Sequence, residues 1–250
     1  MTYYKQSGFS ILSLMISIAM GSFIMAAAIN AYAYSKQAFN TQAALAAASE
    51  NGRFALSDMR RTLLMAGRDI SVDSVDGNSK GLFEQPVGDF NSSISDGDSD
   101  SVAVWYATGK DCHGASINNP TLSEFSVSNG NLQCTVDNDT RTLVSGIEKM
   151  QVLYGIDTTA AGDNYADRYY TATQLNALYT GADPDIWKRL VSIRIGLVAS
   201  SEGGPTIGDN SMTLPTFTVL DQSYTPTNSK KLYRAFSGTI SLRNMNAVNR

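Results

Sequence analysis

An uncharged, apolar segment over residues 11–34 constrains the fold of this chain more than any other feature. The segment contains neither a charged residue nor a proline. As an α-helix rising ~1.5 Å per residue it covers ~36 Å, which exceeds the ~30 Å hydrocarbon core of a bilayer. We therefore expect residues 9–35 to form a membrane-spanning helix that carries the rest of the chain.

A short leader precedes the apolar segment and ends at Gly8. A secretory signal peptide is cleaved after its apolar region, whereas here the plausible cleavage site, between Gly8 and Phe9, lies in front of it. Cleavage at this bond removes residues 1–8 and leaves the anchor on the mature protein. Lys5 is the only charged residue of the leader, and it favours a cytoplasmic N-terminus with the remainder exported. The alternative is an uncleaved signal anchor.

The junction of a basic leader, Gly8-Phe9 and an immediate long apolar helix resembles the processing site of type IV pilins and of the pseudopilins of type II secretion. The resemblance implies that a prepilin peptidase cleaves between Gly8 and Phe9 and that Phe9 becomes N-methylated. These families usually carry a glutamate where this chain has Ser13, and its carboxylate is thought to offset the charged terminal amine within the membrane. Ser13 then indicates that this subunit occupies a special position in the assembly, such as the tip, or that an acidic side chain of a neighbouring subunit offsets the amine. A neutral exchange at a tolerant site is the alternative.

Residues 36–66 continue the helical pattern beyond the membrane, without a proline. Apolar or small residues recur at spacings of three and four, at Leu45, Ala48, Gly52, Leu56, Met59 and Leu63. Charged residues occupy the other side, at Glu50, Arg53, Asp58, Arg60 and Arg61. We expect one helix over residues 10–66, ending before Gly67, with an amphipathic second half that packs on a globular head.

Residues 67–250 form the predicted head, which is rich in β-structure and long loops. Strand-like composition occurs at 101–106, 150–156, 190–198 and 236–242. Residues 122–127 and 131–136 predict a hairpin, and residues 172–179 predict a short helix. Alternation over 190–198 predicts a strand with one buried and one solvated face. The predicted fold class is therefore α+β, pilin-like, with one long N-terminal helix packed on an antiparallel sheet.

Cys112 and Cys134 are the only two cysteines. Export places them in an oxidising compartment, so we expect one disulfide, worth ~3 kcal/mol of stability on the chain-entropy model. His113 adjoins Cys112, but two cysteines and one histidine lack the paired spacing of zinc sites. We therefore expect His113 to be a loop residue rather than a metal ligand.

Two acidic segments have residue types that are found in calcium sites. Residues 96–100 match the first half of an EF-hand loop, but Ser101 replaces the required glycine and Ala107 the bidentate glutamate, so the match fails. The second segment carries Asp157, Asp163, Asn164 and Asp167. Its oxygen atoms could hold a hard cation, but we favour a solvated turn with Arg168 as the counter-charge.

Enzymatic and nucleic-acid-binding functions find little support in the sequence. With a single histidine, His113, few Ser-His-Asp arrangements are available, and no Walker loop is present. A formal net charge of -4 provides no overall basic field for phosphates. We therefore expect no catalytic residues, no cofactor and no direct binding of nucleic acid.

An ordered set of short segments resembles minor pilins of the PilW family. The segments lie at 51–56, 60–61, 65–67, 100–104, 152–157, 166–169, Trp187 with 191–195, and 241–244. The chain is also similar, less closely, to the J-type minor pseudopilins of type II secretion. A third possibility is a signal-anchored envelope protein with a binding function.

The PilW resemblance implies a subunit of low abundance in a priming complex at the tip of a type IV pilus. Its implied partners are other minor pilins, the major pilin, an adhesin-like tip protein, the prepilin peptidase and the inner-membrane assembly platform. The implied location is the inner membrane, with the head in the periplasm, and then the pilus tip at the cell surface. The implied roles are pilus biogenesis, twitching motility and adhesion, with DNA uptake as a further role.

Overall fold

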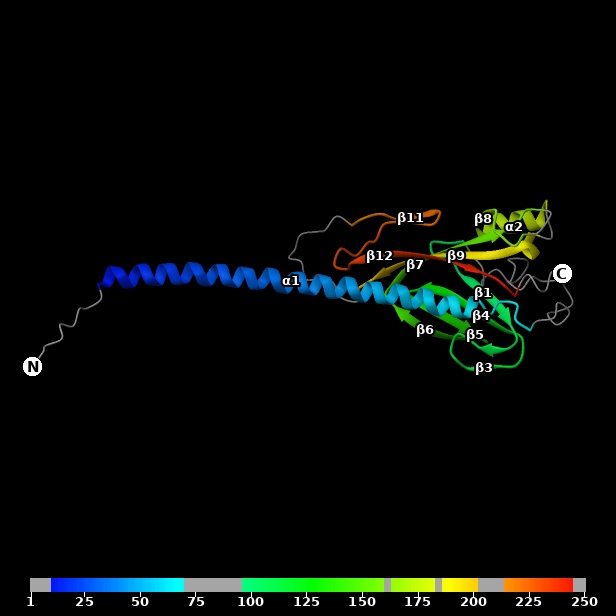
Figure 1. Cartoon of the computed structure of the whole chain (residues 1–250), viewed down its shortest axis with the longest axis horizontal. Helices are drawn as coiled ribbons and strands as arrows, with labels where there is room; N and C mark the ends of the chain where they lie inside the picture. Colours follow the sequence, from blue (N-terminus) through cyan, green and yellow to red (C-terminus); the bar gives the residue numbers. More distant parts are fainter. Residues whose placement is uncertain (1–9, 70–95, 160–162, 183–185, 202–213, 245–250) are drawn as a thin grey trace, which may run out of the picture.

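The computed structural model describes residues 10–69, 96–159, 163–182, 186–201 and 214–244, except for the side chain of Lys188. One long helix, α1 (Ile11–Leu63), projects from a head rich in β-structure (Figure 1). Its 53 residues correspond to ~80 Å of helix. The chain leaves the helix through a turn that ends at Gly67 and Asp69, whose φ angles are 76° and 55°. The predicted single helix is confirmed, with its end three residues earlier than expected.

The described part of the head contains two four-stranded antiparallel sheets rather than the single sheet predicted. The first has the order β1-β4-β5-β6, with β1 (Val102–Tyr106), β4 (Thr121–Ser128), β5 (Asn131–Val136) and β6 (Asp139–Ser145). The second has the order β12-β9-β7-β8, with β12 (Tyr233–Ser241), β9 (Leu190–Ser200), β7 (Ile147–Ile156) and β8 (Arg168–Tyr170).

The remaining elements are short. Two ribbons consist of β2 (Gly109–Lys110) with β3 (Ser116–Ile117), and β10 (Phe217–Val219) with β11 (Gln222–Tyr224). The helix α2 (Ala172–Thr180) and the 3-10 helix η2 (Ile186–Arg189) lie between β8 and β9 in the chain. The predicted α2 and the predicted hairpin of β4 and β5 are both confirmed.

Gly146 divides the sheets. It lies between β6 and β7 with a φ of 75°, a conformation that favours glycine, and its N–H donates to Gly130 at 2.8 Å. A Cβ at this position would lie 2.6 Å from the carbonyl oxygen of Ser200. The chain therefore leaves the first sheet at Gly146 and enters the second with β7.

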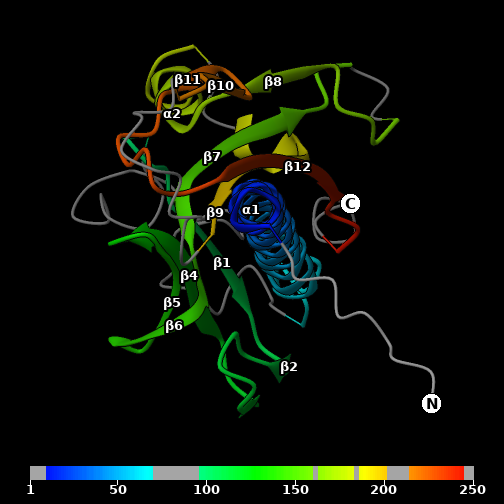
Figure 2. The ribbon, with the colours of Figure 1, turned by 90° about the vertical axis from the view of Figure 1, so that its left-hand side faces the viewer.

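The second half of α1 lies in the concave space between the two sheets (Figure 2). Its buried residues are Ala48, Gly52, Ala55, Met59, Thr62 and Leu63. The predicted apolar face is thus largely correct, although Leu56 is half-buried and Leu45 remains 38% exposed. On the opposite side Glu50, Arg53 and Arg60 are exposed, as expected for an amphipathic helix.

Strand β9 differs from its prediction because both of its faces are covered. Ile195 is paired with Gly238 of β12, which faces Leu56 of α1. On the other face a Cβ at Gly196 would lie 2.7 Å from Val219 of β10. The predicted solvated face is wrong, since the ribbon of β10 and β11 shields it.

Candidate functional site

The first half of α1, which is the predicted membrane anchor, is not covered by the head. Every residue from Ser10 to Tyr34 is exposed, and large apolar side chains such as Phe23 are up to 79% exposed. Among the described residues α1 is the one helix long and apolar enough to cross a membrane, with a mean hydropathy of 2.1 in its most apolar window. So much exposed apolar surface needs lipid or other protein chains around it. Gly8 and Phe9 lie outside the described residues, so cleavage and methylation there stay predictions.

Ser13 occupies the first turn of α1. Its N–H donates to the carbonyl of Ser10 at 2.9 Å, and its own carbonyl accepts from the Ser17 hydroxyl at 2.8 Å. The first turn contains no acidic residue. This chain therefore has no carboxylate in that turn to offset a charged N-terminus.

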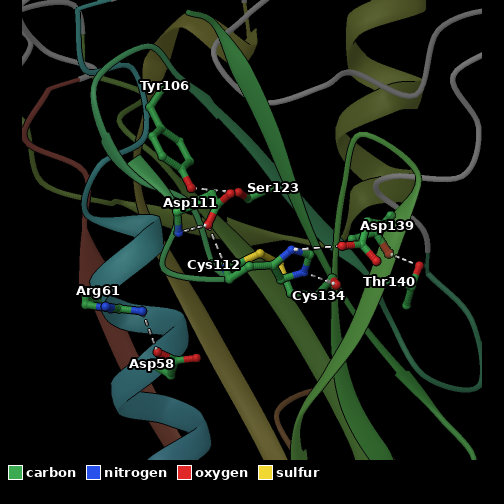
Figure 3. Close-up of a disulfide and its surroundings, with 12 residues drawn as sticks. Asp58, Arg61, Tyr106, Asp111, Cys112, Ser123, Cys134, Asp139 and Thr140 are labelled. Carbon is green, nitrogen blue, oxygen red and sulfur yellow. Dashed lines mark hydrogen bonds and ion pairs between the residues drawn. A yellow bond between two sulfur atoms is a disulfide. The ribbon is translucent and has the colours of Figure 1, made fainter. Parts of the chain in front are cut away.

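Cys112 and Cys134 form the expected disulfide, with their Cα atoms 6.4 Å apart (Figure 3). Both cysteines are buried, and the bond ties the loop after β2 to the centre of β5. The carboxylate of Asp111 accepts the N–H of His113 at 2.9 Å and so shapes the loop that presents Cys112. The bridge therefore fixes this loop on the first sheet.

His113 lies in a loop as predicted, but its side chain is only 4% exposed. Its Nε2 lies 2.9 Å from the carbonyl oxygen of Cys134, and its Nδ1 lies 3.8 Å from Asp139. Within the described part of the chain, Cys112, His113 and Cys134 are the one group whose ligand atoms lie close enough to share a metal ion. Both sulfur atoms are committed to the disulfide, so the group packs the loop on β5.

Asp157 begins the loop considered as a calcium site. Its carboxylate accepts the hydroxyl of Thr159 at 2.7 Å and the N–H of Asn164 at 2.9 Å. These hydrogen bonds, the Thr159 hydroxyl first, lower the pKa of Asp157, and the charge of Arg189 adds to the effect. Arg189, rather than the expected Arg168, thus provides the positive charge; Arg168 lies 5.4 Å from the ring centroid of Tyr170.

The other two aspartates of this loop are also engaged in turns. Asp167 accepts both the N–H and the hydroxyl of Thr158, at 2.8 and 2.9 Å, and Asp163 accepts the N–H of Tyr165 at 3.0 Å. The Asp163 bond, to the N–H two residues on, is that of an Asx turn, whereas Asp167 joins the two ends of the loop. The described part of the loop uses its carboxylates to fix its own backbone.

The acidic residues 96–100 have structural roles that the sequence did not indicate. Asp96 accepts the N–H groups of Ala172 and Thr173 at 2.9 and 2.7 Å, at the N-terminus of α2. A carboxylate satisfies free N–H groups at this end of a helix and interacts favourably with the helix dipole. The pairing joins residues 76 positions apart in the chain, a separation that no local pattern reveals.

The middle of the same segment is fixed on β7. The Lys149 ammonium lies 3.0 Å from Asp98, although the Lys149 side chain is only 3% exposed. The Ser99 hydroxyl accepts the N–H of Met150 at 2.9 Å. The segment therefore holds β7 and α2 together.

Asp100 is buried at the end of this segment. Burial raises its pKa to about 6, with smaller increases from the charges of Asp96 and Asp221. The N–H groups of Val152 and Gly97 donate to the Asp100 carboxylate at 2.8 and 3.2 Å, and these hydrogen bonds lower its pKa. Asp100 is thus expected to change its charge around pH 6, and it does so in a structural position.

A comparison with models of known families shows the family to which this chain belongs. Residues 107–244 match the family model of the type IV pilus-assembly protein W, PilW, over more than half of the chain. The chain belongs to the PilW family. The matched region begins just after β1 and ends just after β12, so it contains the disulfide, α2 and the whole second sheet.

Comparison with solved structures found a type IV-like pilin from Thermus thermophilus. The two chains are 13% identical, with a TM-score of 0.46, over 79% of this chain and 96% of that chain. No curated protein sequence matched the chain.

Membership of the PilW family accounts for the main features of the molecule. PilW proteins are proteins of type IV pilus assembly, which interact with other pilus components. The α+β architecture provides such a component with an apolar helix for the membrane and a disulfide-bonded head. Sequence reasoning found both features, but it missed the roles of Asp96 and Asp100.

Proposed function

We propose that this PilW-family protein is a minor pilin, held in the inner membrane by residues 9–35 and displaying its head in the periplasm. The observation that carries the proposal is the exposed first half of α1 on a head of this family. The apolar surface is suited first to lipid and then to the core of a filament formed by similar helices. The disulfide agrees with a head in an oxidising compartment.

We place the subunit in a priming complex at the pilus tip, with other minor pilins, the major pilin and an adhesin-like protein. Ser13 supports this position, because the first turn of α1 lacks a carboxylate to pair with the terminal amine of a neighbour. The prepilin peptidase and the inner-membrane assembly platform are the expected partners before assembly. Twitching motility, adhesion and DNA uptake are the functions that such a complex would support.

The experiment that tests the proposal is mass spectrometry of the N-terminal peptide in filaments sheared from cells and in the membrane fraction. A chain that starts at N-methylated Phe9 and is present in the sheared filaments is the expected result. Gly8→Val is expected to leave Met1 intact and to exclude the protein from filaments, whereas Gly21→Ala, beyond the cleavage site, keeps processing intact.

Two other outcomes would contradict the proposal. Processed protein that occurs only in membranes, in cells with a type II secretion system, would indicate a J-type pseudopilin. Unprocessed wild-type protein in membranes would indicate a signal-anchored envelope protein.

A further inference from the structure

The edges of the two sheets differ in how they are protected. An unprotected edge strand presents free N–H and C=O groups and pairs readily with other chains, so most edges are shortened, charged, bulged or covered. The N–H of Gly67 donates to Trp105 of β1 at 2.8 Å, and the N–H of Ala107 donates to Arg68 at 2.9 Å. The turn after α1 therefore covers the edge at β1.

Two further edges carry protective features of their own. Strand β8 has only three residues, Arg168–Tyr170. Strand β6 carries Asp139 and Arg141, and its register with β5 is interrupted by a bulge. Neither edge offers a long, regular row of free backbone groups.

Strand β12 lacks these features. It has nine residues, Tyr233–Ser241, pairs with β9 without a register shift, and contains one charged residue, Arg234, and no proline. Among the described strands, none pairs with its other edge. It is therefore the longest regular edge that the described part of the head leaves open.

The register shows which backbone groups face outward. The N–H of Leu242 donates to Val191 at 2.9 Å, and in an antiparallel ladder the residues that bond the partner strand alternate. Even-numbered residues of β12 therefore bond β9, and the odd-numbered ones direct their N–H and C=O groups away from it. These outward residues include Ala235, Ser237 and Thr239, whose side chains are also exposed.

A groove of about 330 Å³ lies beside this edge, between α1 and β12. Leu56, Ser57 and Arg60 form its helical wall, and residues 237–240 form its other wall. Gly238 faces Leu56 across the groove, and a Cβ at this position would lie 3.9 Å from Leu56, an ordinary van der Waals distance. A strand added to β12 would thus have room to direct side chains toward α1.

We propose that the free edge of β12 and the adjoining groove accept an extended segment of a different protein subunit as an additional β-strand. Main-chain hydrogen bonds to the odd-numbered residues would provide affinity, and alternate side chains in the groove would provide specificity. The inference rests on the proposed function only in taking the donor from the pilus assembly.

Charge indicates the chemistry of the donor segment. Arg60 lines the groove, Arg234 is the charged residue of β12, and Arg194 of β9 donates to the Thr239 hydroxyl at 3.4 Å, so all three of these charged side chains are positive. A segment with an acidic side chain complements them, whereas a second copy of this chain would bring a second set of the same positive charges. The occupant is therefore a heterologous, acidic, extended segment.

The test uses the full-length protein in cells that assemble the pilus. A photo-crosslinking amino acid at Thr239 is expected to form a covalent adduct with a different protein, and mass spectrometry of the adduct identifies an extended acidic segment. The same probe at Thr142, which is exposed on β6, is the matched control and is expected to form no such adduct.

Ser237→Pro removes one outward N–H without removing a hydrogen bond to β9, because proline is tolerated where an edge N–H faces solvent. We expect this change to lower the adduct yield at Thr239 about tenfold. Thr142→Pro is the control and leaves the yield unchanged. Resistance of the head to proteolysis shows that both variants fold.

Absence of an adduct at Thr239, an adduct with a second copy of this chain, or a yield that Ser237→Pro does not lower would overturn the inference. The sheared-filament fraction reports separately on the proposed function. If the protein is present in filaments but forms no adduct, the minor-pilin proposal stands and the added-strand proposal fails. If the adduct forms but the protein is absent from filaments, the added-strand proposal stands and the minor-pilin proposal fails.

Discussion

Among single residues, Gly52 determines how closely α1 approaches β12. A Cβ there would collide with the ring of Phe236, whose Cγ would lie 3.0 Å away. We expect Gly52→Ala to lower the free energy of unfolding by about 1–2 kcal/mol, because overpacking outweighs the helical gain of ~1 kcal/mol. Thermal unfolding of the full chain in detergent measures the effect. Gly21→Ala, with no atom within 4 Å of its Cβ, is the control and shows no loss; equal behaviour of the two variants would contradict the argument.

Asp100 gives the head a defined dependence on pH. Its pKa is raised from 3.8 to about 6, so between these values the folded chain binds a proton more readily than the unfolded chain. Its contribution to stability is therefore larger at low pH and declines as pH rises through 6. We expect the unfolding free energy of the wild type to increase when the pH is lowered from 7 to 5. Measured against the same change in Asp100→Asn, the increase should be about 1 kcal/mol, allowing for solvent screening. Urea titrations of both proteins at the two pH values measure it, and parallel pH profiles would refute it.

At the scale of elements, the contact of residues 96–100 with α2 joins two segments of the head that are far apart in the chain. Asp96→Ala removes the acceptor for the N–H groups of Ala172 and Thr173, while the capping box of Thr171 and Gln174 remains. We expect a loss of about 1 kcal/mol and faster amide exchange in α2. Hydrogen exchange followed by mass spectrometry measures both. Asp163→Ala, in an exposed turn, should leave α2 unchanged; equal exchange in the two variants would show that Asp96 does not stabilise the helix.

The elements also show what the sequence could and could not predict. The hairpin of β4 and β5 was predictable because its signal, Asn129-Gly130, is local, and both residues have positive φ angles of 51° and 71°. The division into two sheets was not predictable, since it depends on Gly146 and on strand register. The buried second face of β9 was missed because its cover, β10, lies farther along the chain. Among candidate site residues, the disulfide followed from cysteine count, whereas the role of Asp96 depends on a contact across 76 positions.

For the whole molecule, the outer face of α1 is the surface that the proposed assembly would use for contacts between subunits. The second half of α1 keeps Phe39 and Phe54 exposed, at 70% and 57%, on a helix whose other face is buried in the head. Neither ring contributes to the core of this chain, so their apolar surface is available to neighbouring subunits. Stability of the head and incorporation into filaments should therefore respond to different residues of the same helix.

Phe54→Ser tests this separation. We expect the unfolding free energy to change by less than about 0.5 kcal/mol, because the ring is mostly exposed, while the amount of protein in sheared filaments falls severalfold. Met59→Ser is the matched change on the buried face, five residues along α1, and should cost about 2–5 kcal/mol and lower the protein level in every fraction. Thermal unfolding in detergent and quantitative immunoblotting of membrane and filament fractions provide the two measurements. Loss of stability in Phe54→Ser, or undiminished incorporation, would mean that the outer face of α1 does not carry contacts between subunits.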